Sequence, residues 1–310
     1  MAKKEKVALD GLEKFNRISH PTNILFNLLF VIFSLTCIIP VLLVLAISVT
    51  SEQAINKFGY HLIPQAFSVE GYAFLMKQGT MIARAFGVSL LVTVVGTVLG
   101  VLLTTAMGYA MSRPNYKLKG LLTWIVFIPM VFNGGLVSTY FVVGSLLGLK
   151  NTLGALIFPL AVSSFNVVIC KTFFKQTVPD SLIESAKIDG AGQFTIFFRI
   201  VLPISLPLLA TIGLFLTFAY WNDWYQSMLY IDQAGLKSLQ ALLNDIMSDI
   251  AAMSSQIANL GAEGAAIAAN MPAESARMAI VVIVVFPIAC AYPYFQKYFI
   301  SGLTVGAVKG

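Results

Sequence analysis

Long apolar stretches recur along the 310-residue chain, and shorter polar segments separate them. Each apolar stretch has roughly 20 residues or more, which is enough for a helix to cross the hydrocarbon core of a bilayer. The alternating segments of about 10 residues that a transmembrane β-barrel needs are not seen. The pattern therefore predicts an all-α polytopic membrane protein. About six transmembrane helices are expected, at 24–50, 83–111, 120–147, 152–175, 204–231 and 275–298.

The first apolar stretch is expected to remain in the mature chain as a helix. It lacks the short core followed by a small-residue cleavage site that marks a signal peptide. The chain then divides into an N-terminal segment 1–23, a transmembrane domain 24–300 and a tail 301–310.

Composition and charge agree with a membrane protein. Hydrophobic residues make up 58% of the chain and charged residues only 11%, a balance more apolar than one soluble core requires. An even number of spans places both termini on one side, which we expect to be the cytoplasm, because fourteen of the twenty basic residues then lie inside. The net charge of +6 is explained by anionic lipid headgroups, with no nucleic acid needed. The six basic residues left outside are Lys57, Lys77, Arg84, Lys150, Lys237 and Arg277.

The cysteines and histidines form no recognisable chemical site. Cys37, Cys170 and Cys290 lie in apolar runs without metal-ligand spacing, so we expect buried packing and no disulfide. His20 and His61 are far apart, and the chain has no His-Glu-x-x-His motif or phosphate-binding glycine loop. We therefore expect no metal, no bound cofactor and no enzymatic activity in this chain.

One cytoplasmic connection, 176–203, is too long to be a simple turn. Pro179 and Asp180 signal the start of a short amphipathic helix, and Gly190 ends it. A second helical stretch leads to Pro203. The segment predicts a helix-turn-helix across the cytoplasmic mouth, whose apolar face is buried either in the headgroup layer or in a groove of a partner.

The same segment carries a specific motif. Glu184-Ser185-Ala186, then Gly190 after three residues and Ile200-Val201-Leu202-Pro203 after nine more, resembles the EAA loop of bacterial ATP-binding-cassette (ABC) importer permeases. Ser185 replaces the usual alanine, a small-for-small change. The resemblance implies a type I importer permease fold and a coupling helix that sits in a cleft of an ATPase subunit. The residues it assigns to ATPase coupling are Glu184, Ser185, Ala186, Asp189, Gly190, Ala191, Ile200, Leu202 and Pro203.

The tail narrows the resemblance to the carbohydrate-uptake branch. It is similar to the tail of the maltose-type second permease subunit, which inserts at the interface of the ATPase dimer. The matching residues that we assign to this contact are Gly302, Leu303, Thr304, Gly306 and Lys309. The resemblance implies a second homologous permease, two ATPase subunits that use ATP and Mg, an extracellular solute-binding protein and a sugar substrate, with an oligosaccharide favoured.

Two outer features remain open to more than one interpretation. An aromatic segment with an Asn-Asp pair either lines the sugar pathway or forms an interfacial belt and a structural turn. Its residues are Trp221, Asn222, Asp223, Trp224 and Tyr225. In the maltose-type system the substrate contacts lie mainly in the other permease subunit. An external amphipathic helix at about 235–260 either packs on the chain's own outer surface or docks a solute-binding protein.

Three alternative functions were weighed against a sugar importer. An importer permease for another solute would lack this type of tail. A lone channel would not explain a loop and a tail that are both suited to an ATPase. A polytopic enzyme would need a nucleophile, metal or acid-base pair at membrane depth, and none is evident.

Overall fold

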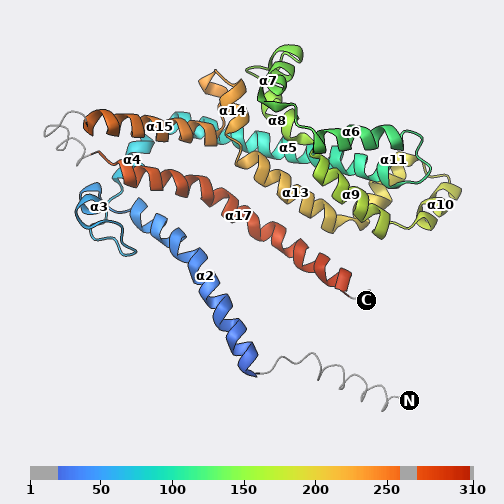
Figure 1. Cartoon of the computed structure of the whole chain (residues 1–310), viewed down its shortest axis with the longest axis horizontal. Coiled ribbons are helices and arrows are strands. Elements are labelled where there is room, and N and C mark those ends of the chain that lie inside the picture. The colour runs from blue at the N-terminus through green and yellow to red at the C-terminus, as the bar shows by residue number, and fades with distance from the viewer. Residues whose placement is uncertain (1–19, 259–270, 308–310) are drawn as a thin grey trace. The chain divides into compact units, whose positions relative to one another are not determined.

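The computed structural model describes residues 20–258 and 271–307, and these residues are almost entirely helical (Figure 1). Within those ranges, the one β-type pairing is an isolated antiparallel bridge between Thr50 and Phe67. The all-α prediction is thus confirmed. The helices before residue 150 are α2 (His20–Ser48), α3 (Glu52–Phe58), α4 (Glu70–Met76), α5 (Gly79–Ser112), α6 (Lys119–Val131), α7 (Gly135–Tyr140) and the π-helix η1 (Phe141–Leu146). Those after it are α8 (Leu153–Ala161), α9 (Ser164–Thr177), α10 (Asp180–Ile188), α11 (Gln193–Ile196), the π-helix η2 (Phe197–Val201), α12 (Leu202–Ile204), α13 (Leu206–Trp221), α14 (Tyr225–Tyr230), the 3-10 helix η3 (Ala234–Leu236), α15 (Leu239–Ala258) and α17 (Ala273–Ala307).

The chain forms two compact units. The first comprises residues 1–72 and 269–279, and the second comprises 73–268 and 280–310. In the first unit, the buried Glu52 carboxylate accepts hydrogen bonds from the backbone N–H groups of Glu274 (3.1 Å) and Ser275 (3.2 Å). Because these amides open α17 and have no partner within the helix, the carboxylate caps it.

The second unit is built around α5, which packs against α13, α8 and α9. Small residues on α5 allow these helices to approach it closely. A Cβ at Gly96 would lie 2.4 Å from the Tyr220 ring, and one at Gly108 would lie 2.4 Å from the Cβ of Cys170. Tyr220 in turn donates its hydroxyl to the Ile157 carbonyl of α8 at 2.7 Å. Interfaces of small residues are typical of helices that associate in membranes, where backbones must come close for packing to stabilise the pair.

Three helices are long and apolar enough to cross a membrane by themselves, at 21–48, 79–112 and 273–293. Two further candidates are bent pairs, Leu153–Ala161 with Ser164–Thr177 (47°) and Gln193–Ile204 with Leu206–Trp221 (85°). The described residues therefore hold up to five spans, and the count of six stays a prediction.

The expected helix 120–147 is not continuous in the structure. It is divided into Lys119–Val131 and Gly135–Leu146, and Gly135 between them has a φ of +82°. The Asn133 carboxamide accepts a hydrogen bond from the Gly135 N–H at 2.8 Å, which stabilises the turn. The expected helix 204–231 likewise ends at Trp221 and resumes as α14.

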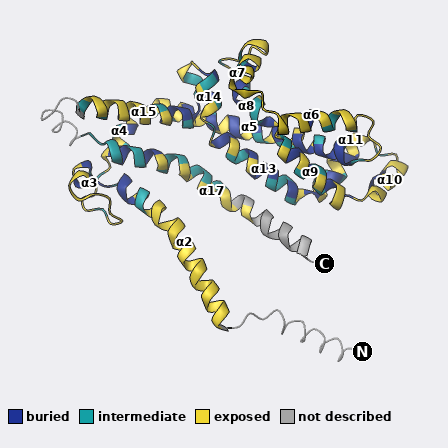
Figure 2. Cartoon of the chain, viewed as in Figure 1, coloured by how far each residue is buried: buried dark blue, intermediate teal, exposed yellow. Residues whose placement is uncertain are grey.

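Burial separates the central helices from α2. Figure 2 shows α5 and α13 with many buried positions and α2 exposed over most of its length. Exposed leucine, isoleucine and phenylalanine side chains are those expected of a surface that lipid or another membrane chain covers. The prediction of buried cysteines holds for Cys170 but is wrong for Cys37 and Cys290, which are exposed. The prediction failed for these two because an apolar sequence that faces lipid has the same composition as one that faces a protein core.

The external amphipathic helix is α15. Its apolar residues at helical spacing, Leu239, Leu243, Ile246 and Ile250, are buried. The Leu239 N–H donates to the Ser89 hydroxyl of α5 at 2.8 Å. This half of the helix packs on the chain's own surface, whereas Met253 further along is exposed.

Candidate functional site

The predicted cytoplasmic helix-turn-helix is present, with α10 and α11 as its helices. Pro179 precedes α10 with a φ of −62° in an extended conformation, which suits an N-cap position. At the other end, Gly190 has a φ of +84°, and the Ala191 N–H donates to the Ala186 carbonyl at 2.9 Å. A glycine in the left-handed region with hydrogen bonds back into the last turn is the usual way a helix ends.

The loop has one face toward the protein and one toward its surroundings. Ile183 and Ala186 are buried in a cluster with Ile196, Phe197 and Val201. The motif residues Glu184, Ser185, Asp189 and Gly190 are exposed, as is Pro203, whereas Ala191, Ile200 and Leu202 are half-buried. Some residues of the motif thus pack the loop against the protein, and others form its exposed surface.

Two large apolar side chains project from this free surface. Ile188 at the end of α10 is 86% exposed, and Phe194 at the start of α11 is 82% exposed. They lie on either side of the Gly190 turn. Exposed apolar residues beside a carboxylate at one tip are typical of a docking surface.

Arg113, at the C-terminus of α5, connects α10 to the helix bundle. Its guanidinium forms an ion pair with Asp180 in the first turn of α10 at 2.8 Å. It also donates to the carbonyls of Phe174 (3.0 Å) and Val178 (3.3 Å) at the end of α9. The guanidinium lies 5.3 Å from the centre of the Tyr109 ring. One side chain therefore joins three helices. The sequence indicates only that Arg113 is one of the fourteen basic residues expected inside, because its partners are distant along the chain.

The tail residues lie at the end of α17. This helix continues to Ala307, so the backbone of Gly302, Leu303, Thr304 and Gly306 is helical. Lys309 lies outside the described residues.

Three of the five candidate pathway residues have partners within the chain. Trp221 is buried, and its indole N–H donates to the Val284 carbonyl at 3.1 Å. The Asn222 amide donates to the Phe218 carbonyl of its own helix at 3.0 Å. The Asp223 carboxylate accepts from the Gln226 N–H at 3.3 Å, which caps α14.

Trp224 and Tyr225 are the two exposed aromatic residues of this segment. Their rings meet edge to face at 6.0 Å and 83°. Trp224 also lines a pocket of about 190 Å³ with Gln240 and Asn244 of α15. These two amides are four residues apart on α15, and the sequence gives no sign that an aromatic ring lies beside them.

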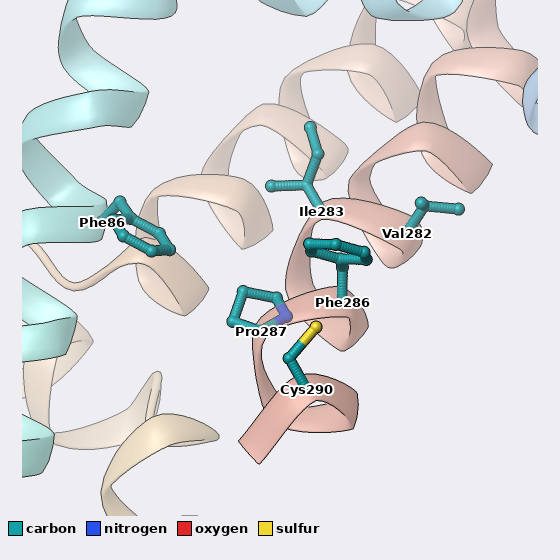
Figure 3. Close-up of a pocket in the computed structure, with 6 residues that line it drawn as sticks. All are labelled: Phe86, Val282, Ile283, Phe286, Pro287 and Cys290. Carbon is teal, nitrogen blue, oxygen red and sulfur yellow. The ribbon is translucent and has the colours of Figure 1, made fainter. Parts of the chain in front are cut away.

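A second, larger groove of about 430 Å³ lies between α5 and α17. Figure 3 shows Phe86 of α5 projecting toward α17, whose Ile283, Pro287 and Cys290 lie on the other side. The groove has almost no hydrogen-bonding surface, so it suits an apolar guest better than a hydroxylated one.

A polar clamp joins the loop before α8 to the loop after α14, a region expected to lie outside. Asn151, with a φ of +58°, accepts hydrogen bonds from the N–H groups of Asp232 (2.7 Å) and Gln233 (3.3 Å). Lys150 pairs with Asp232 at 3.0 Å. The hydrogen bond from Lys150 lowers the pKa of Asp232 from its ordinary value, and the same contact raises the pKa of Lys150.

Comparison with protein families identifies the chain. Residues 96–305 match the family described as "Binding-protein-dependent transport system inner membrane component". The chain belongs to this family. The match includes the coupling loop, α13, α15 and most of α17, so the permease's candidate sites all lie within or beside the shared region.

Curated relatives extend this likeness over nearly the whole permease. It is 36% identical to the polygalacturonan/rhamnogalacturonan transport system permease protein YtcP of Bacillus subtilis, over 93% of this chain and 99% of that protein. It is 37% identical to Protein LplC of the same organism over 88% and 90% of the two chains. The arabinooligosaccharides transport system permease protein AraQ of Bacillus subtilis is 26% identical over 93% and 96%.

The fold also matches a solved structure. A chain of a bacterial ABC transporter involved in the import of the acidic polysaccharide alginate aligns with a TM-score of 0.77 and 24% identity, covering 91% of this permease and 99% of that chain. The two chains share the fold of an ABC importer permease.

Proposed function

We propose that this permease is one of two transmembrane subunits of an ATP-driven, binding-protein-dependent oligosaccharide importer in the bacterial cell membrane. The proposal rests on the family, since binding-protein-dependent inner membrane components are transport proteins. Relatives named for polygalacturonan/rhamnogalacturonan and for arabinooligosaccharides support a carbohydrate substrate.

The observation that carries the mechanism is the exposed apolar tip of the coupling loop. A tip with Ile188 and Phe194 exposed gains free energy when a groove covers it, and full burial of one such side chain is worth about 1.5–3 kcal/mol. Two ATPase subunits supply the groove, and it is these subunits, rather than this chain, that bind ATP and Mg. Glu184 beside the tip offers a carboxylate to a basic or amide partner.

Movement of the ATPase then reaches the membrane helices through rigid contacts. Closure of the ATPase dimer on ATP pulls α10 inward, and the Arg113 contacts pass this displacement to α5 and α9. The helices move from inward-open to outward-open while an extracellular binding protein releases the sugar. The second homologous permease forms the other half of the pathway, and both termini lie in the cytoplasm, where the tail also reaches the ATPase.

Co-purification from the native membrane tests the assembly. We would compare wild type with Ile188→Ser and Gly190→Pro, and use Ile63→Ser as the matched control. Ile63 is 76% exposed and lies on a segment expected to face outside. Wild type and the control should recover an ATPase, a second permease and a sugar-binding protein.

The two loop variants should lose the ATPase while the second permease stays bound. Losing one buried isoleucine weakens docking by about tenfold or more, since each 1.4 kcal/mol is a factor of ten. Recovery of this chain alone under gentle conditions would contradict the importer proposal. Equal ATPase recovery with Ile188→Ser and with Ile63→Ser would contradict the assigned docking surface.

A further inference from the structure

The small pocket beside Trp224 has the composition of a ligand site. One side is formed by Gln240 and Asn244 of α15, and the other by the aliphatic side chains of Ile280, Val281 and Val284 of α17. Its volume of about 190 Å³ equals that of roughly six waters at about 30 Å³ each, and is below the roughly 300–1,000 Å³ of sites for drug-sized molecules. It has room for one ring of a ligand rather than a chain.

The polar groups of this pocket have unused hydrogen-bonding capacity. Gln240 and Asn244 are four residues apart on α15, so they share one face of the helix. The Nε2 of Gln240 is buried and has no hydrogen-bond partner in the protein. A buried donor without a hydrogen-bond partner destabilises the folded protein. A small rotation of the Gln240 side chain would bring this Nε2 into the pocket, where a hydroxyl group of a ligand would accept its hydrogen bond.

The aromatic ring gives the pocket a flat apolar surface. Trp224 is 43% exposed, and its edge-to-face contact with Tyr225 limits the ring's orientation. A pyranose has an apolar C–H face and a rim of hydroxyls, so an indole beside two carboxamides matches both parts. The larger groove in Figure 3 lacks this combination, because its six side chains include no amide or hydroxyl.

The charge of the pocket restricts the kind of sugar. Its eight lining residues include no charged side chain, and a carboxylate taken out of water needs a cation or several N–H donors. A uronic acid ring therefore fits poorly and a neutral ring fits well. Lipid is a poor occupant as well, because two carboxamides at the pocket would face hydrocarbon.

We propose that this pocket is a subsite for one neutral pyranose unit of the transported oligosaccharide, located on this permease itself. The inference rests on the proposed function and adds the substrate class and the residues that contact it. Trp224 stacks on the sugar ring, and the amides of Gln240 and Asn244 bond its hydroxyls.

Photolabelling of the assembled transporter tests this subsite. The complex in lipid nanodiscs is irradiated with maltotriose that carries a diazirine, and labelled peptides are identified by mass spectrometry. We expect label on the segment from α14 to α15 and competition by free maltotriose but not by trigalacturonate. Gln240→Leu should reduce labelling at least about fivefold. Gln256→Leu, an exposed glutamine on the same helix, should leave it unchanged.

A second variant keeps the test independent of the amides. Val281→Phe fills the pocket without removing a polar group, and it should also abolish labelling. Label only on the second permease, equal labelling of Gln240→Leu and wild type, or competition by trigalacturonate would each overturn the subsite. Because the ATPase is retained in the same preparation if the importer assembles, failure of the subsite is distinguishable from failure of the proposed function.

Discussion

At the residue scale, the Arg113 side chain links three helices of the second unit, α5, α9 and α10. Its partners lie 61 to 67 residues away in sequence, and its side chain is only 13% exposed. Hydrogen bonds that involve a charged group and are shielded from water contribute about 1.5–3 kcal/mol each. Arg113 is thus a positioning residue for α10, and the proposed function assigns α10 to ATPase coupling.

Replacing Arg113 should uncouple transport from ATP hydrolysis. In proteoliposomes, we expect Arg113→Ala to lower the sugar transported per ATP hydrolysed by about tenfold. Arg113→Lys should be intermediate, because lysine keeps the charge but not the planar fork that reaches several carbonyls. Lys117→Ala removes an exposed charge from the same segment and should have no effect. An unchanged ratio in Arg113→Ala would contradict the positioning role.

Gly96 should be intolerant of even one added methyl group. The Cβ of Gly96→Ala would overlap the Tyr220 ring, and overpacking of this kind costs about 1–3 kcal/mol. Gly87→Ala is the control on the same helix, because open space surrounds Gly87 and alanine favours the helix by up to about 1 kcal/mol. Thermal unfolding in detergent should show a lower midpoint for Gly96→Ala only. Equal midpoints would mean that α5 and α13 are less closely packed than described.

The roles of some residues could be predicted from the sequence, and the roles of others could not. Gly190 could be predicted, because the end of a helix and the motif spacing are both local signals. Arg113 could not be recognised, because its partners are distant in sequence. Trp221 is a further example: its indole N–H meets the Val284 carbonyl, and a tryptophan that packs reads in sequence like one that binds a sugar.

At the element scale, the loops at the outer end depend on Asn151. Its side chain accepts two backbone N–H groups, and its own backbone is left-handed. Asn151→Gly keeps the left-handed backbone but loses the side-chain hydrogen bonds, and each lost bond lowers the free energy of unfolding by about 0.5–1.5 kcal/mol. Asn151→Ala loses the bonds and adds about 1–2 kcal/mol of backbone strain. Denaturation midpoints should rank wild type above glycine and glycine above alanine; the reverse order would show that the turn is not a fixed element.

The neighbouring ion pair predicts a simple pH dependence. Because the pKa of Asp232 is lowered in the folded protein, its contribution to stability is present above the ordinary value of about 3.9 and is lost as the pH falls through the folded pKa. The difference in thermal midpoint between wild type and Asp232→Asn should therefore stay constant from about pH 8 to pH 5. It should disappear in stronger acid. A difference that changes near pH 6 or 7 would point to another group.

The long apolar helices could be predicted, but the short helices α3 and α4 and the breaks within the long ones could not. Hydropathy located every apolar stretch, because lipid and protein interiors both select such residues. It did not show the 85° bend before Leu206 or the interruption of 120–147. The interruption of 120–147 involves a local polar contact, that of Asn133 with Gly135. An average of hydropathy over many residues does not detect such a contact.

At the scale of the whole molecule, the orientation in the membrane decides whether the coupling tip can meet an ATPase. The distribution of basic residues predicts that the loop 176–203 is cytoplasmic. Two isoleucines provide a matched pair of probes, because Ile188 and Ile63 are both strongly exposed and are expected on opposite sides.

Single cysteines at these positions should react from opposite sides of the membrane. In a background with Cys37, Cys170 and Cys290 replaced by alanine, a membrane-impermeant maleimide added to intact spheroplasts should label Ile63→Cys and spare Ile188→Cys. Inside-out vesicles from cells that lack the ATPase should give the reverse. Labelling of both positions from the same side would refute the topology. Because docking covers the tip, restoring the ATPase should protect Ile188→Cys from labelling in those vesicles. Unchanged labelling would mean that the ATPase docks elsewhere.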